Sequence, residues 1–78
     1  MQENSRGFES VLDELICFQQ NKLLGLAREI VPYITQDDLL QVFDFPELEQ
    51  CAFFRYEEGV LEGLLTAKTS YLRWVKEN

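Results

Sequence analysis

Two long stretches of the chain, residues 7–32 and 53–76, space their apolar side chains as an amphipathic helix does. In the first stretch, one stripe of apolar residues at helical spacing comprises Leu12, Ile16, Leu23, Ala27 and Ile30. Flanking apolar residues widen each stripe to about half of the helix circumference, which is broader than the seam of a two-stranded coiled coil. We therefore expect two long helices, of which the first begins near Asn4 or Ser5 as N-cap and ends near Pro32.

The segment between these stretches carries signals for short helical turns. Thr35 and Asp38 have the spacing of a capping box, with Asp in place of the usual Glu. Asp44 is expected to cap a second short turn, with Pro46 in its first turn and Glu47 reaching back to the cap. The connector is therefore predicted to be partly helical.

Two long helices joined by a compact connector predict an all-α fold, in which residues 1–78 form one antiparallel helical hairpin. If the helices fold back evenly, facing residues have numbers that add to about 85, so Gly25 faces position 60 and Cys17 faces position 68. Cys17 and Cys51 then lie far apart, and we interpret them as small buried hydrophobic residues in a reducing compartment. A polar N-terminus without an apolar leader segment leads us to expect a cytoplasmic protein.

The chain holds more apolar side chains than one hairpin can bury. Apolar residues make up 46% of the sequence, while a domain of this size buries only about 60% of the surface that its unfolded chain exposes. Half a dozen large side chains left in water lose about 10 kcal/mol, which is comparable to the stability of a whole domain. We predict a homodimer that forms a four-helix bundle with two-fold symmetry, and a different protein as partner is the alternative.

Charge is distributed unevenly along the hairpin. The chain has a net charge of −7, and eight acidic residues against Arg55 alone lie between Thr35 and Glu62. The end that holds both termini carries the bases Arg6, Lys68, Arg73 and Lys76. Antiparallel stacking of two hairpins therefore sets each acidic bend near the basic end of the other copy. An acidic bend excludes nucleic acid and acidic membrane surfaces as its partners, and no apolar run is long enough to span a membrane.

Small residues recur every four positions in the second long helix, at Gly59, Gly63 and Ala67. Because each glycine inside a helix costs about 1 kcal/mol relative to alanine, we expect a close approach of backbones, either between the two helices or between two chains. A groove for a ligand or peptide is the alternative. The predicted helix-packing or dimer surface comprises Gly25, Gly59, Leu61, Gly63, Leu64 and Ala67.

Aromatic residues gather around the predicted bend. One interpretation is a small core that fixes the connector on the hairpin, and the other is an acid-rimmed aromatic surface that binds a basic segment of another protein. Burial of Phe43, Phe45 and Phe54 distinguishes the two. The predicted partner-binding bend comprises Asp37, Asp38, Phe43, Phe45, Glu47, Phe54, Glu57 and Glu58.

The sequence has no histidine, which bears on every catalytic hypothesis. The Glu-x-x-His motif of dimetal bundles is missing, and a serine or cysteine nucleophile lacks its usual base. We therefore expect no enzymatic activity and no cofactor, and predict a non-enzymatic interaction or adaptor module. The alternatives are a metal-binding bundle that uses pairs such as Glu58 with Glu62 or Glu9 with Asp13, and an acidic mimic of nucleic acid.

Overall fold

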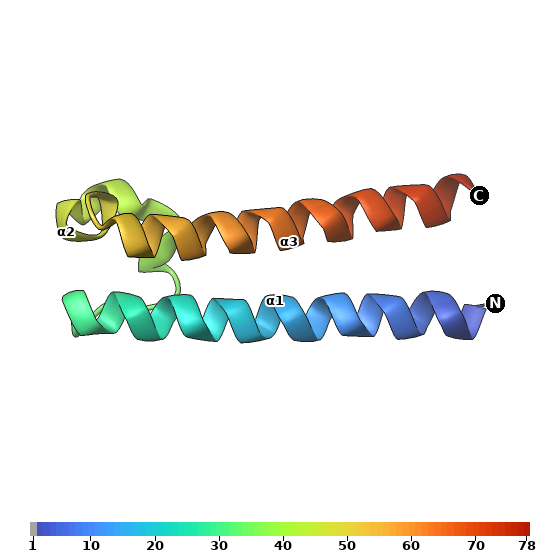
Figure 1. The fold of residues 1–78 in the computed structure, drawn as a ribbon, viewed down its shortest axis with the longest axis horizontal. Coiled ribbons are helices and arrows are strands. Elements are labelled where there is room, and N and C mark those ends of the chain that lie inside the picture. The colour runs from blue at the N-terminus through green and yellow to red at the C-terminus, as the bar shows by residue number, and fades with distance from the viewer. Residues whose placement is uncertain (1) are drawn as a thin grey trace.

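The structure is a computed structural model that describes the backbone of residues 2–78 and the side chains of residues 7–78. Its elements are helix α1 (Gln2–Ile30), the 3-10 helix η1 (Asp38–Asp44), the short helix α2 (Pro46–Glu49) and helix α3 (Ala52–Glu77). Helices α1 and α3 lie side by side and antiparallel, with both termini at one end and the connector at the other (Figure 1). The predicted all-α hairpin with short helical turns in its connector is confirmed.

Helix α1 lies where a long helix was predicted, but its ends differ slightly. It begins at Gln2, earlier than expected, and the side chains of the predicted N-cap residues Asn4 and Ser5 lie outside the described ones. It ends at Ile30, and the last helical hydrogen bond joins the Val31 N–H to the Ala27 carbonyl at 2.7 Å. This end confirms the predicted stop near Pro32. The physical reason is that proline disfavours helical dihedrals at the residue before it.

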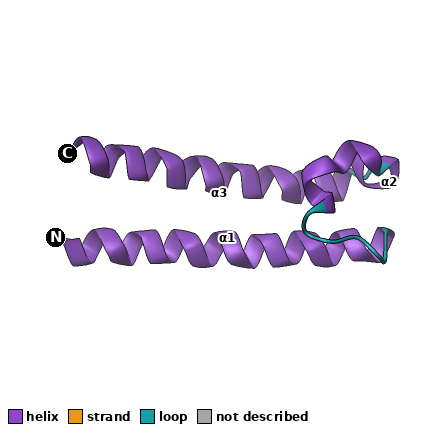
Figure 2. Cartoon of the chain, turned by 180° about the vertical axis from the view of Figure 1, so that it is seen from behind, coloured by secondary structure: helices purple, strands orange, loops and turns teal. Residues whose placement is uncertain are grey.

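The connector starts with a loop that runs back along α1 before η1 begins (Figure 2). The predicted capping box is confirmed: the Thr35 N–H donates to Asp38 Oδ2 at 3.0 Å, and the Asp38 N–H donates to Thr35 Oγ1 at 3.3 Å. The side chain of Arg28 ties the loop to α1, since its Nε donates to the Ile34 carbonyl at 3.1 Å. Local hydrogen bonds therefore hold this loop in place.

The predicted cap of the second short turn is wrong by one residue. Asp44 is the last residue of η1, and Phe45 is the N-cap of α2, with φ −127° and ψ 83° and no side-chain hydrogen bond. Pro46 occupies the first turn as predicted. Because proline pushes the residue before it into an extended conformation, the backbone leaves the helix at Phe45 and not at Asp44.

The hydrophobic core lies at the bend, where the connector covers the ends of both long helices. Its buried members come from all parts of the chain near the bend: Leu23, Ala27, Ile34, Val42, Leu48 and Phe54. Phe45 and Cys51 are half-buried and pack against this core. The interpretation of the bend as a small core is thus confirmed for Phe54 and Phe45, whereas Phe43 is exposed.

The register of the hairpin differs from the even one by about one helical turn. Lys68 forms an ion pair with Asp13 and does not lie opposite Cys17, and the rings of Phe8 and Tyr71 meet edge-on with centroids 4.8 Å apart. Both long helices meet the connector one or two residues earlier in the chain than predicted, which accounts for most of this shift.

The prediction that both cysteines are buried is wrong for Cys17, which is exposed. Cys17 follows the buried Ile16 by one residue, and one residue turns a helix by about 100°, so its side chain points away from α3. Cys51 is half-buried, and both cysteines are free.

Candidate functional site

Each long helix turns one row of side chains towards the other helix. On α1 the inward row is Phe8, Leu12, Ile16, Gln19, Leu23 and Ala27, and on α3 it is Phe54, Glu57, Leu61, Leu64, Lys68 and Tyr71. These side chains are buried or half-buried, or they contact the opposite helix, as Phe8 contacts Tyr71. The inward rows divide the hairpin into two sides, which differ in chemistry.

One side, which we name the apolar face, consists of the residue immediately before each inward residue. Its members on α1 are Gly7, Val11, Leu15, Phe18, Lys22 and Leu26, and its members on α3 are Phe53, Tyr56, Val60, Gly63, Ala67 and Ser70. Trp74 extends the α3 row, with its ring centroid 6.4 Å from that of Tyr71. Because the helices are antiparallel, the same rotation of about 100° brings both rows to one side of the hairpin. Several of these side chains are largely exposed, among them Phe18 at 67% and Tyr56 at 62%.

The opposite side, the connector face, consists of the residues that follow the inward rows, and it is mostly polar. A cleft on this side is lined by Gln20 of α1, by Gln36, Leu39 and Leu40 of the connector, and by Glu58, Glu62 and Leu65 of α3, together with the inward Leu23 and Leu61. The connector therefore folds over one side of the hairpin and leaves the apolar face without a cover from its own chain.

A polar cluster joins the two helices close to the bend. Gln19 Nε2 donates to the backbone carbonyl of Glu57 at 2.9 Å and to its Oε1 at 2.8 Å, and Lys22 Nζ lies 3.1 Å from Glu57 Oε2. The Gln19 hydrogen bond and the Lys22 ammonium together hold the pKa of the Glu57 carboxyl below its ordinary value. Gln19 and Glu57 are both buried, so a slip of α1 along α3 would leave polar groups without partners.

Sequence reasoning overlooked this cluster, although one signal was present. Gln19 occupies an apolar position of the α1 stripe, four residues before Leu23 and three after Ile16. A polar residue at a core position predicts a buried partner, because an unsatisfied buried amide is destabilising. In the described part of the chain, no buried side-chain nitrogen or oxygen lacks a hydrogen bond.

The predicted helix-packing residues separate into two groups. Leu61 and Leu64 are half-buried and face α1, as predicted for the interior of the hairpin. Gly25, Gly59, Gly63 and Ala67 are exposed, and a Cβ added at any of the three glycines would meet nothing within 4 Å. The interpretation of the small residues as a close approach between α1 and α3 is therefore wrong, because they point away from that interface. A close approach between two chains stays a prediction.

The predicted partner-binding residues of the bend are not gathered at one place. Phe54 and Glu57 face the interior, Phe45 is half-buried, and Asp38 is half-buried and engaged in the capping box. Phe43 is 77% exposed, and Asp37 and Glu47 are exposed. The side chain of Glu58 lies on the connector face, with its Oε1 3.3 Å from Arg55 Nε.

A second hollow of the connector face brings part of the predicted bend site together. It lies between η1 and α3 and is lined by Leu39, Leu40, Val42, Phe43, Arg55, Glu58 and Glu62. Leu40 and Glu62 were missed by sequence reasoning, and Leu40 is 81% exposed. Leu39 is half-buried and Val42 is buried, whereas Leu40 and Phe43 are exposed. The backbone kinks at Gln41 (φ −125°, ψ 54°), between the two members of each pair, so no single helical period relates them.

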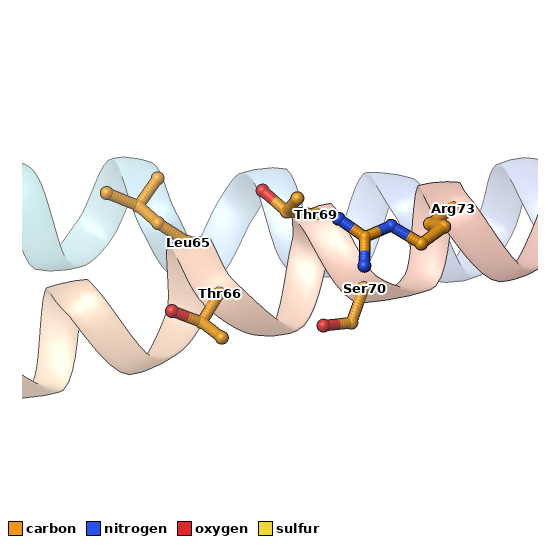
Figure 3. A pocket seen from close by; sticks show the side chains of 5 residues that line it. All are labelled: Leu65, Thr66, Thr69, Ser70 and Arg73. Carbon is orange, nitrogen blue, oxygen red and sulfur yellow. The ribbon is translucent and has the colours of Figure 1, made fainter.

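A further hollow on the outer surface of α3 carries little chemistry. Its five lining side chains, Leu65, Thr66, Thr69, Ser70 and Arg73, all belong to one helix (Figure 3). No second element supplies a group to bind or orient a ligand there. We therefore do not assign it a function.

Two of the four carboxylates considered as metal ligands form ion pairs within the chain. Asp13 pairs with Lys68, and Glu58 pairs with Arg55. Among the described residues, no group of three or more His, Cys, Asp or Glu side chains is arranged to hold a metal ion. Within the same residues, none of the helices combines the length and the apolar composition that a membrane span requires. Comparison of the chain with protein-family models, with curated proteins and with solved structures finds no match.

Proposed function

We propose that this chain is a non-enzymatic protein–protein interaction module that works as a homodimeric helical bundle in the cytoplasm and offers its acidic bend to a partner with a basic segment. The observation that carries the proposal is the apolar face. Large apolar side chains from both long helices, such as Val11, Phe18 and Val60, lie exposed on one side of the hairpin. Contiguous apolar surface of this kind marks interaction sites, because its exposure to water is unfavourable.

A second copy of the chain is the proposed occupant of the apolar face. Two stacked hairpins give four long helices around one apolar centre, which is the arrangement of a four-helix bundle. The connector does not obstruct this stacking, because it lies on the opposite side. The bundle would therefore bury side chains that a single hairpin leaves in water.

The connector face stays accessible in such a dimer and supports the second part of the proposal. Exposed Leu40 and Phe43 lie beside the carboxylates of Glu58 and Glu62 in one hollow. Apolar contacts together with carboxylates suit an amphipathic segment that carries lysine or arginine. Arg55 holds Glu58 in an ion pair within the chain, which leaves Glu62 as the main charge for such a segment.

Sedimentation of the purified protein tests the dimer. We expect the wild-type chain to sediment as a dimer, and Phe18→Asp to sediment as a monomer, because a charge at this apolar position opposes burial. Asn21→Asp introduces the same charge at an exposed position outside the apolar face and should leave the dimer intact. A wild-type chain that stays monomeric at high micromolar concentration would contradict the proposal.

Titration with a synthetic amphipathic peptide of leucine and lysine tests the acidic hollow. We expect the double variant Glu58→Gln and Glu62→Gln to bind this peptide at least tenfold more weakly than the wild type. The double variant Glu14→Gln and Glu77→Gln removes the same charge at exposed positions outside the hollow and serves as control. Equal weakening in both double variants would mean that only net charge attracts the peptide.

A further inference from the structure

The midpoints of the two rows of the apolar face lie level with each other along the hairpin. On α1 the row runs from Gly7 to Leu26, and its midpoint falls between Ile16 and Cys17. On α3 the row runs from Phe53 to Trp74, and its midpoint falls beside Gly63. The ion pairs Asp13–Lys68 and Lys22–Glu57 fix the hairpin register on either side of these points. In that register, the two midpoints lie directly opposite one another across the hairpin.

From this arrangement we propose that two copies pair antiparallel through the apolar face, about a two-fold axis that passes beside Gly63 of α3 and between Ile16 and Cys17 of α1. The inference rests on the proposed function and adds the geometry of its dimer. Under such an axis, α1 stacks on α1 and α3 stacks on α3 of the second copy. A single two-fold axis can pass through the middle of both rows because the two midpoints face each other.

The size of the face suits a stable dimer. The molecule measures 45 by 19 Å in its two long directions, so one whole side of the hairpin, of which the apolar face is a part, has a projected area of about 850 Å². A standard protein–protein interface buries about 800 Å² of each partner. A dimer of standard size would therefore occupy most of this side of the hairpin, without a contribution from the connector face.

Charge selects the antiparallel orientation. The acidic bend of one copy then lies near Lys68, Arg73 and Lys76 of the other, whereas parallel stacking would place the two acidic bends together. Opposite charges at the ends of the bundle thus favour one orientation and penalise the other.

Side-chain size agrees with the same axis. The α3 row carries large rings at both ends, Phe53 and Tyr56 near the bend and Trp74 near the terminus, and small side chains at Gly63 and Ala67 in between. Antiparallel pairing sets the rings of the bend against Trp74 of the other copy. The free space around Gly63 allows the two α3 backbones to approach closely at the axis. In this arrangement the exposed glycine, which costs helix stability, lies where close packing is needed.

Disulfide cross-linking in the Cys17→Ser and Cys51→Ser background tests the axis, with a glutathione redox buffer as oxidant. A residue beside a two-fold axis meets its own counterpart, so Gly63→Cys should cross-link to itself in high yield. Residues equidistant from the axis meet each other, so Val60→Cys mixed with Ala67→Cys should give the mixed dimer. Tyr56→Cys alone should not cross-link above the level of Thr66→Cys, which lies outside the apolar face.

The outcomes separate this inference from the proposed function. Parallel pairing would stack α3 on α1 of the other copy and bring position 56 close to position 26. Strong cross-linking of Tyr56→Cys mixed with Leu26→Cys, with the mixed Val60 and Ala67 pair at background level, would therefore show parallel pairing and overturn the axis while the dimer stands. If every variant cross-links only as Thr66→Cys does and the protein sediments as a monomer, the proposed dimer fails as well. If Gly63→Cys disturbs the fold, the mixed pair of Val60→Cys and Ala67→Cys still decides between the two orientations.

Discussion

The bend end and the shaft of the hairpin use the same pair of helices, yet they bury their side chains to very different degrees. We call the part of the hairpin where α1 and α3 lie side by side without the connector the shaft. At the bend, Ala27, Leu48 and Phe54 have no exposed surface. Along the shaft, Leu12 and Ile16 of α1 are buried but keep 6% and 8% exposure, and no side chain of α3 from Glu58 to Glu77 is buried. The bend has a third layer, the connector, whereas the shaft has only two helices. Two helices bury one stripe on each, so side chains become fully enclosed on both helices where a further element covers them from the side.

This comparison locates the stability of a single chain at the bend and its need for a partner along the shaft. Four substitutions, in order of decreasing effect, test the separation.

The largest effect is expected at the bend. Phe54→Ala should lower the free energy of unfolding by about 3–5 kcal/mol, because it leaves a cavity in the closed core. Urea denaturation followed by circular dichroism measures this change. Phe43→Ala removes the same ring from an exposed position and should change stability by less than about 0.5 kcal/mol. Equal effects of the two variants would show that the connector does not close a core.

A smaller effect on stability is expected from a substitution at Gly63, beside the proposed two-fold axis, and its sign should differ between monomer and dimer. In a monomer, Gly63→Ala meets nothing and should stabilise the helix by about 1 kcal/mol. In the proposed dimer, the added methyl groups separate two backbones, and the dissociation constant should rise. Gly25→Ala, which is also exposed but lies outside the apolar face, should stabilise in either case. Sedimentation equilibrium measures the change in the dissociation constant, and thermal melting measures whether each variant is stabilised or destabilised.

The pH dependence of stability tests the polar cluster where the shaft meets the bend. The folded-state pKa of Glu57 is lowered by Gln19 and Lys22, so the unfolded chain binds a proton more readily than the folded one. The cluster therefore stabilises the hairpin above the unfolded-state pKa of Glu57, and this contribution is lost as the pH falls through the folded-state pKa. Glu57→Gln should weaken the decline of stability between neutral and acidic pH. Urea denaturation at a series of pH values measures it, and an unchanged profile would contradict the assignment.

The smallest effect is expected at the ion pair of the shaft. Asp13 raises the pKa of Lys68 through a hydrogen bond at the surface. The pair therefore stabilises the hairpin below the unfolded-state pKa of Lys68 and loses this effect as the pH rises through the folded-state pKa. Exposed pairs contribute little and are screened by salt. Lys68→Met should lower the melting temperature slightly at low salt and by less at high salt, and a drop as large as that of Phe54→Ala would contradict this ranking.

The local signals of the sequence predicted much of the architecture. The apolar period placed both long helices, Pro32 placed the end of the first, and Thr35 with Asp38 placed the turn that opens η1. These features depend on interactions between residues close in sequence, which residue types and spacing are enough to specify. The predicted cap at Asp44 is wrong because two local signals competed there. The preference of Asp for the N-cap favoured Asp44, but the effect of Pro46 on the residue before it made Phe45 the cap.

The candidate surfaces were predicted less well. Phe43 and Phe54 have the same side chain and both lie near the bend, yet one is exposed and the other buried. Gly63 was assigned either to packing between the two helices or to a dimer surface, and it points away from α1. In each case, the outcome depends on which side of the hairpin the connector covers. Spacing along one helix does not contain that information.

The sequence alone determined that this protein has two long amphipathic helices, an acidic partly helical connector and more apolar surface than a pair of helices can bury. Only the tertiary structure decided the register, through Gln19, Glu57 and Asp13, and the side on which the connector lies. The physical reason is the range of the interactions. Helical period and caps are set within a few residues, whereas register and coverage depend on contacts between segments that chain folding brings together.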